Sequence, residues 1–290
     1  MSSAPWRTAV LATILLSFSA SRLAAQTWDQ VGERAQGMAG AFVAVADDST
    51  AAYWNPAGLA TGSTFDAQVS AGDERKLFLG AAMPALGFSY YRIRSVVNDS
   101  GSRKTGGSGE VRVSLADTGN FGVSLLQTVV NGLVIGSTLR LVSAGDTHGF
   151  DADLGAMGSV GTVRVGITAR NLRETVDAQR RVRLGTAWVP RSLPKGVHGP
   201  FSLSFDVDLN RSASEVGGQR EAALGSEQWW LGGSIGTRVG VRWNVSSDAK
   251  PALAGGLTVK LPYSVFAEGH VTKGAEDENI DWGFGGRVTF

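Results

Sequence analysis

The amino-acid sequence predicts an all-β fold, a closed antiparallel transmembrane β-barrel of about 14 strands. Three observations predict it. Apolar and polar residues alternate with a period of two over most of residues 63–290, as in strands that have two different faces. Glycine supplies 39 of the 290 residues, about twice its ordinary share of ~7 %, which disfavours a helical protein. An export signal precedes the strands, and no later stretch is apolar enough for a helical span.

The export signal is predicted over residues 1–25. Arg7 precedes an apolar run at residues 9–18, and small residues follow as far as Ala25. A charged start, a short apolar core and small residues before the cleavage point are typical of a secretory signal peptide. The apolar run is shorter than the ~20 residues that a membrane-spanning helix needs. We therefore expect cleavage near Ala25, and export of the mature chain.

Residues 26–62 are predicted to form a hatch, or plug, inside the barrel, and residues 63–290 the barrel itself. Glycine or alanine occupies almost every second position of the first half of this segment, which would let its backbone fit a narrow space. Its end predicts a short helix, because asparagine can cap a helix and proline suits the first helical position. The hatch residues singled out are Gly37, Gly40, Asp47, Asp48, Asn55, Pro56, Ala57 and Gly58.

Alternation alone does not separate a membrane barrel from a soluble periplasmic β-sandwich, which stays an alternative. Three further features favour the barrel. Only 6 of the 27 basic residues are lysines, whereas a soluble surface usually carries both types. Tryptophan and tyrosine lie at predicted strand ends, where a membrane barrel has its aromatic girdles. The last strand, residues 280–290, ends on Phe290, like the terminal strands that outer-membrane assembly machinery reads. The expected location is the bacterial outer membrane.

The connections between strands predict orientation and strand number. Long, polar connections are expected near 272–279, 246–250, 210–225, 171–180 and 143–149, and short turns near 260–262, 233–236, 159–161 and 130–132, with a longer turn at 190–199. Short turns face the periplasm in such barrels, so both termini and the start of the hatch should be periplasmic. A first count gives fifteen strands. Assigning residues 110–115 to an extracellular excursion restores the even number that closure requires.

Charged residues on the predicted inward faces would line the lumen. A mixed lining of this kind would either restrict an aqueous path or form a structural network that fills a closed lumen. Asp47 and Asp48 would hold the hatch against lumenal arginines, or would serve as turn residues at a strand end. The predicted lining residues are Arg140, Arg164, Arg170, Arg183, Arg238, Arg242, Arg287, Asp206, Asp208 and Glu268.

The composition argues against several classes of function. The net charge of +1 gives no electrostatic basis for nucleic-acid binding, and the absence of cysteine excludes thiolate metal sites. The three histidines (His148, His198 and His270) are expected in or beside loops, without metal-ligand spacing. No nucleophile elbow or phosphate-binding loop is found. We expect no enzyme activity, catalytic residue, metal or cofactor.

The residues from Gly32 to Asp48, followed by Tyr53-Trp54-Asn55-Pro56-Ala57-Gly58-Leu59, resemble the N-terminal signature of the PorV/PorQ group of FadL-like outer-membrane proteins. Residues 153–155, 165–172 and 183–188 are similar to later motifs of that group. The resemblance covers nearly the whole mature chain, and its N-terminal motif is the most specific part. It implies a fourteen-stranded barrel with an inward-folded hatch. The chain is much shorter than FadL and has few long loops, so a loop-borne capture site is not implied.

Two functions follow from the resemblance. In the first, the barrel lies in outer-membrane lipid and gives passage to small hydrophobic compounds past the hatch, through an opening where strand pairing is locally broken. In the second, it is a non-transporting scaffold whose partner is a protein of an export or surface-attachment machine. A soluble periplasmic β protein is the third alternative.

Overall fold

A computed structural model describes residues 30–73, 76–98, 113–130, 132–175, 178–190, 199–214, 217–246, 250–275 and 280–290. The predicted signal peptide and its cleavage point lie outside these ranges, as do His198 and residues 110–112 of the predicted excursion.

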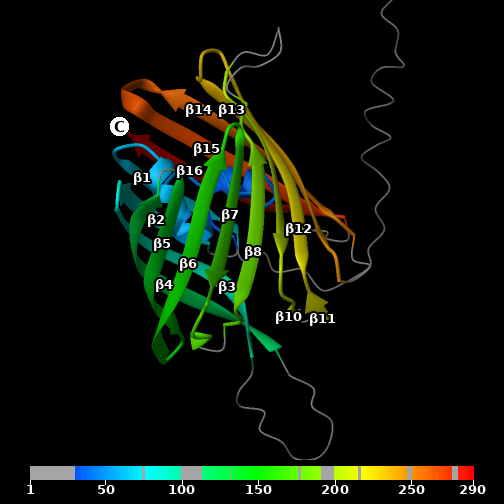
Figure 1. Cartoon of the computed structure of the whole chain (residues 1–290). Helices are drawn as coiled ribbons and strands as arrows, with labels where there is room; N and C mark the ends of the chain where they lie inside the picture. The colour runs from blue at the N-terminus through cyan, green and yellow to red at the C-terminus, as the bar shows by residue number, and fades with distance from the viewer. Residues whose placement is uncertain are drawn as a thin grey trace, which may run out of the picture.

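Fourteen strands in the described part of the chain form one closed barrel (Figure 1). Each strand pairs antiparallel with its neighbours, and β1 pairs with β16 from Asp66↔Thr289 to Gly72↔Gly283, which closes the ring. A small separate sheet, made of β10 (Ser212–Ser214) and β11 (Gly217–Gln219), lies in the connection after β9. The barrel strands are β1 (Asp66–Gly72), β2 (Leu77–Met83), β3 (Leu86–Asn98), β4 (Val113–Val130), β5 (Leu133–Ala144), β6 (Thr147–Val160), β7 (Val163–Arg170), β8 (Arg181–Trp188), β9 (Phe201–Asp208), β12 (Glu221–Trp230), β13 (Ile235–Asn244), β14 (Ala252–Leu261), β15 (Val265–Gly274) and β16 (Ile280–Thr289).

The alternation in the sequence becomes the two faces of the wall. In β9, Leu203 and Phe205 are exposed on the outer surface, whereas Asp206 and Asp208 are buried toward the lumen. In β16, Trp282 is likewise exposed outward. The predicted fold class and the number of barrel strands are confirmed. None of the helices in the described part is both long and apolar enough to cross a membrane.

Two predicted connections are wrong. The one expected as long near residues 143–149 is a tight turn, because β5 runs to Ala144 and β6 begins at Thr147. Val113, Ser114 and Leu115 were assigned to an excursion, but they belong to β4. The reason is that β3 and β4 keep pairing as far as Asn98↔Val113, beyond the end of the short strand β2.

The N-terminal segment, residues 30–62, lies inside the ring of strands, where it is drawn in blue in Figure 1. It contains α2 (Glu33–Gly37), α3 (Ala51–Trp54) and the 3-10 helix η1 (Pro56–Thr61). All but one of the side chains from Gln30 to Leu59 are buried. Phe42, Tyr53 and Trp54 of the segment pack into one apolar cluster with wall residues that include Tyr91. The core of this molecule is therefore the interior of the barrel.

The segment begins at the opposite end of the barrel from the one predicted. Gln30 lines one cavity with Arg170 and Arg181 and another with Lys76, and all three wall residues lie beside connections on the side away from the C-terminus. At its other end, Leu59 lies against Gly87, next to a short turn. The sequence did not predict the end at which Gln30 lies, because strand parity fixes only where the segment meets β1. The segment crosses the lumen before it reaches that strand.

Candidate functional site: the lumenal contacts of the N-terminal segment

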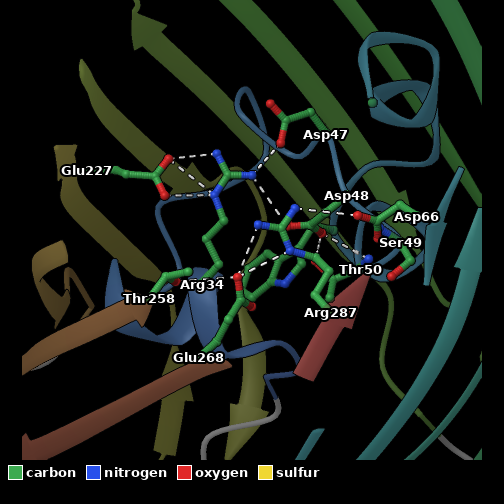
Figure 2. Close-up of polar contacts among 12 residues, drawn as sticks. Arg34, Asp47, Asp48, Ser49, Thr50, Asp66, Glu227, Thr258, Glu268 and Arg287 are labelled. Atoms are coloured by element: carbon green, nitrogen blue, oxygen red, sulfur yellow. Dashed lines mark hydrogen bonds and ion pairs between the residues drawn. The ribbon is translucent and has the colours of Figure 1, made fainter. Parts of the chain in front are cut away.

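Arg34 of α2 joins the segment to the wall. Its Nε and Nη2 atoms donate to the two carboxylate oxygens of Glu227 on β12, at 2.9 and 2.7 Å. On its other side, Nη1 bonds Asp47 and lies 3.3 Å from Oδ2 of Asp48 (Figure 2). Burial by itself lowers the pKa of Arg34, but the carboxylates of Asp47 and Glu227 outweigh it and raise that pKa well above its ordinary value. Arg34 is therefore a permanent cation.

Glu227 also connects Arg34 to a second set of charges. It accepts a hydrogen bond from Nε of Arg238 at 2.8 Å, and Arg238 Nη1 donates to Thr258 at 2.6 Å. Thr258 in turn donates to Glu268 at 3.3 Å. Figure 2 shows Glu227 of β12, Thr258 of β14 and Glu268 of β15 around Arg34 of the segment. One carboxylate, that of Glu227, therefore bridges a guanidinium of the segment and a guanidinium of the wall.

Arg287 on β16 completes the network beside the end of the segment. It pairs with Glu268 at 3.1 Å and with Asp66 at 3.4 Å. Asp66 also accepts a hydrogen bond from the backbone N–H of Ser49 at 2.8 Å. Asp48 has the turn role considered for it, and the arginine that it contacts belongs to the segment and not to the wall. One of its oxygens accepts the N–H of Thr50 at 3.0 Å, as in a turn, and the other faces Arg34.

Asp206 on β9 holds the middle of the segment. Its Oδ2 atom accepts the backbone N–H groups of Phe42 and Val43, both at 2.8 Å. Nearby, Arg183 Nη1 lies 3.4 Å from the carbonyl oxygen of Gly40. A carboxylate aimed at two adjacent N–H groups satisfies donors that the irregular backbone at this point would leave unpaired.

We predict that Asp206→Ala loosens the segment by about 2 kcal/mol or more, because two buried N–H groups lose their acceptor at roughly 1–3 kcal/mol each. Asp206→Asn keeps an acceptor oxygen at the same place, and we expect a much smaller loss. Hydrogen exchange of the amides of Phe42 and Val43 in the refolded protein measures the difference. Equal protection in the two variants would contradict this role.

Asn55 fixes the turn before η1. Its Oδ1 atom accepts the N–H of Ala57 at 3.2 Å, which caps η1, with Pro56 as the first residue of that helix. Its Nδ2 atom donates to the carbonyl oxygens of Val43 at 3.0 Å and of Ala156 at 3.1 Å. Both groups of the amide are thus used: the oxygen bonds within the segment, and the nitrogen bonds both the segment and strand β6.

Glycines let the segment approach the wall. A Cβ atom on Gly155 would lie 2.1 Å from Oδ1 of Asn55, and one on Gly256 would lie 3.1 Å from the Cα atom of Gly37. Within the segment, a Cβ on Gly58 would lie 1.9 Å from the carbonyl oxygen of Ala46. The small residues of the segment meet small residues of the strands, so the two backbones are in contact.

The remaining predicted lining residues lie on the inner face at different levels. Arg140 pairs with Asp153 at 2.8 Å, and Arg183 pairs with Asp208 at 2.7 Å. Arg242 is buried on β13. Arg164 is half-buried near the short turn after β6, away from the ends of β7 and β8 where Arg170 lies.

Sequence reasoning missed four of the residues that matter here. Arg34 and Glu33 stand in a small-residue segment, and Glu227 stands in a strand, next to none of the other charges in sequence. His270, expected in or beside a loop, is buried in β15, and its Nδ1 atom contacts the carboxylate of Glu33. The alternation of β15 places His270 on the same face as Glu268, and this signal would have assigned it to the lumen.

No cluster of three or more histidine or acidic side chains suited to a metal ion occurs among the residues that the structure describes. Most of the charges described above are instead arranged as pairs of opposite sign. Buried ion pairs of this kind hold a polypeptide segment in one position inside a closed interior.

No family model matches the sequence, and a comparison with curated proteins finds no relative. Solved structures do resemble the fold. A FadL homologue of Pseudomonas aeruginosa superimposes with a TM-score of 0.56 at 10% identity, over 91% of this chain and 99% of that one. The toluene transporter TodX of Pseudomonas putida superimposes with a TM-score of 0.50 at 10% identity, over 83% of this chain and 93% of that one. At this identity the likeness shows the fold, a closed antiparallel barrel of the FadL kind.

Proposed function

We propose that this protein is an outer-membrane barrel that gives passage to small hydrophobic compounds past an N-terminal hatch. In this proposal residues 1–25 are a signal peptide cleaved near Ala25, residues 26–62 the hatch and residues 63–290 the barrel. The fold likeness to a FadL homologue and to a toluene transporter supports the class of cargo. The outward apolar face and inward charged face support a position in lipid.

The observation that carries the proposal is an apolar groove in the outer wall beside the segment. The groove has a volume of about 610 Å³, which is in the range of small-molecule sites. Outward side chains of β1, β2, β3, β4, β15 and β16 line most of it, and Leu79, Phe88 and Phe121 are among its apolar members. Three polar residues of the inner face, Gln68, Ser89 and Arg287, also line it. Ala67, Ala81 and Gly286 have small or no side chains there, so the wall is hollowed at this place.

The hatch lies directly behind this groove. Gly80 lines the groove from β2, and a Cβ atom on Gly80 would lie 3.1 Å from the Cβ of Ser49 in the segment. Only one strand backbone therefore separates the hatch from the lipid side. The pairing of β1, β2 and β3 is continuous, contrary to the broken pairing that was expected. Passage would require these strands to separate locally, and β2 has only 7 residues to hold it.

A disulfide lock tests this route, because the chain has no cysteine of its own. Ala81 and Phe88 are direct partners across β2 and β3, and directly opposite residues are close enough for a disulfide. We expect cells that carry oxidised Ala81→Cys/Phe88→Cys to take up labelled toluene or fatty acid no faster than cells without the protein. Reduction should restore the uptake.

The matched control is Val165→Cys/Thr186→Cys, a direct pair across β7 and β8, away from the groove strands. This lock should leave uptake at the wild-type rate. If uptake is the same in cells with the wild-type protein, with either locked variant and without the protein, the transport function is refuted. Uptake that depends on the protein but ignores the first lock would refute only the lateral route.

The scaffold function keeps one observation in its favour. The segment is tied to the wall by buried ion pairs at Arg34 and by the contact of Glu33 with His270, which suits a permanent plug. In that case the rim and its connections would bind an export-machinery protein. Purification in mild detergent tests this alternative, since it requires a partner protein in stoichiometric amount and no protein-dependent uptake.

A further inference from the structure

A small cavity lies between the N-terminal segment and the ends of β7 and β8. Its volume is about 10 Å³, which is room for one water molecule or an ion of similar size. Three guanidinium groups line it, from Arg170, Arg181 and Arg183, together with the side-chain amide of Gln30. The cavity is separate from the network around Arg34 and Glu227, and from the groove in the outer wall.

The arginines around this cavity are not equally paired. Arg183 pairs closely with Asp208 at 2.7 Å and with Glu221 at 2.8 Å. Arg181 reaches the same two carboxylates only at 3.9 and 3.7 Å. Arg170 has no carboxylate within ion-pair distance in the described part of the chain. Within ion-pair distance, the three guanidinium groups thus share two carboxylates, and Arg170 is the one that neither carboxylate reaches.

Two donors at the cavity also lack an acceptor. The Nε atom of Arg170 and the Nε2 atom of Gln30 are buried and have no hydrogen-bond partner within the described ranges. Gln30 as a whole is 3% exposed. Arg170 is held from the other side by Tyr53, since its guanidinium carbon lies 3.4 Å from the centre of that ring. Buried donors in native structures are nearly always paired, so these two donors point to an acceptor as the ligand of the cavity.

We propose that this cavity binds one monovalent inorganic anion of the size of chloride, between Arg170, Arg181 and the amide of Gln30. The sign follows from the two unpaired donors and from the three guanidinium groups that line the cavity. The size follows from the volume, which is too small for phosphate or an organic carboxylate. The anion joins Gln30 of the segment to the wall. It therefore stabilises the docked segment in proportion to its occupancy.

Crystals of the full chain soaked in sodium bromide give the direct test, because bromide scatters anomalously and resembles chloride. We expect an anomalous peak in the cavity of the wild type and of Arg164→Gln, and none in Arg170→Gln. Arg164 is the matched control, since it lies on the same inner face of β7 at the other end of the strand. A wild-type cavity without a peak would overturn the proposal. An equal peak in Arg170→Gln would show an adventitious ion only, and would overturn it as well.

Thermal unfolding of the refolded protein supplies a second measurement. At equal ionic strength, chloride in place of gluconate should raise the Tm by about 2 °C or more, in a saturable way, for wild type and Arg164→Gln. The rise should vanish in Gln30→Ala, which removes a donor without changing charge and serves even if Arg170→Gln fails to fold. An equal rise in Gln30→Ala would overturn the proposal.

Discussion

Gly240→Ala is expected to displace the N-terminal segment while the barrel stays folded. A Cβ atom at this position of β13 would lie 2.4 Å from the carbonyl carbon and 2.5 Å from the carbonyl oxygen of Met38, and 2.7 Å from the nitrogen of Ala39. These are backbone atoms, so no side-chain rotation relieves the clash. β13 is fixed by ladders on both sides, whereas the segment is held by side-chain contacts, so the segment is the part that moves.

Overpacking of this kind costs about 1–3 kcal/mol, which corresponds to a rise of about 5- to 150-fold in the population with an undocked segment. We expect protease to cut the segment of Gly240→Ala about ten times faster, and single-channel conductance to rise. The unheated protein should still migrate as a folded barrel.

Gly255→Ala is the control, because it changes the adjacent strand by the same methyl group. Its Cβ would meet nothing closer than the carbonyl oxygen of Arg238 at 3.9 Å. Wild-type protease resistance and conductance are expected. If Gly240→Ala keeps the segment as well protected as Gly255→Ala does, the close packing of segment against wall is refuted.

Glu227→Gln is expected to give the largest loss of stability by a single change. The substitution removes the charge that bridges two buried guanidinium groups. Arg34 keeps the carboxylates of Asp47 and Asp48 on its other side. Arg238 keeps the hydroxyl of Thr258, which is neutral. Breaking a buried ion pair by neutralising one partner costs about 3–5 kcal/mol. Urea unfolding of the refolded barrel, followed by tryptophan fluorescence, measures this loss.

The control for Glu227→Gln is Glu174→Gln. Glu174 pairs with Arg180 at 3.2 Å, but both side chains are about half exposed. An exposed pair contributes about 0–1 kcal/mol, so the midpoint should hardly move. Equal losses from the two variants would mean that the buried network does not hold the structure.

The sequence determined the barrel because each strand of a closed β wall has one apolar and one polar face, which appear as alternation along the chain. A residue that faces lipid must be apolar and its neighbour on the strand faces the lumen, so strands such as residues 201–208 reveal both faces by their alternation. The small residues of the N-terminal segment likewise indicated close packing, and Asn55 with Pro56 indicated the turn. These signals are local, and each needs only a few neighbouring residues to be recognised.

What only the tertiary structure decided is how the lumen is filled. Arg34 and Glu227 are 193 positions apart in sequence, and nothing local in either neighbourhood marks them as partners. Closure of the ring also decides three other features. These are the end of the barrel at which Gln30 lies, the burial of His270, and the gathering of arginines at the ends of β7 and β8. Closure brings side chains from distant strands into one narrow space, where charge and volume must balance across the lumen, and no pattern along a single strand records that balance.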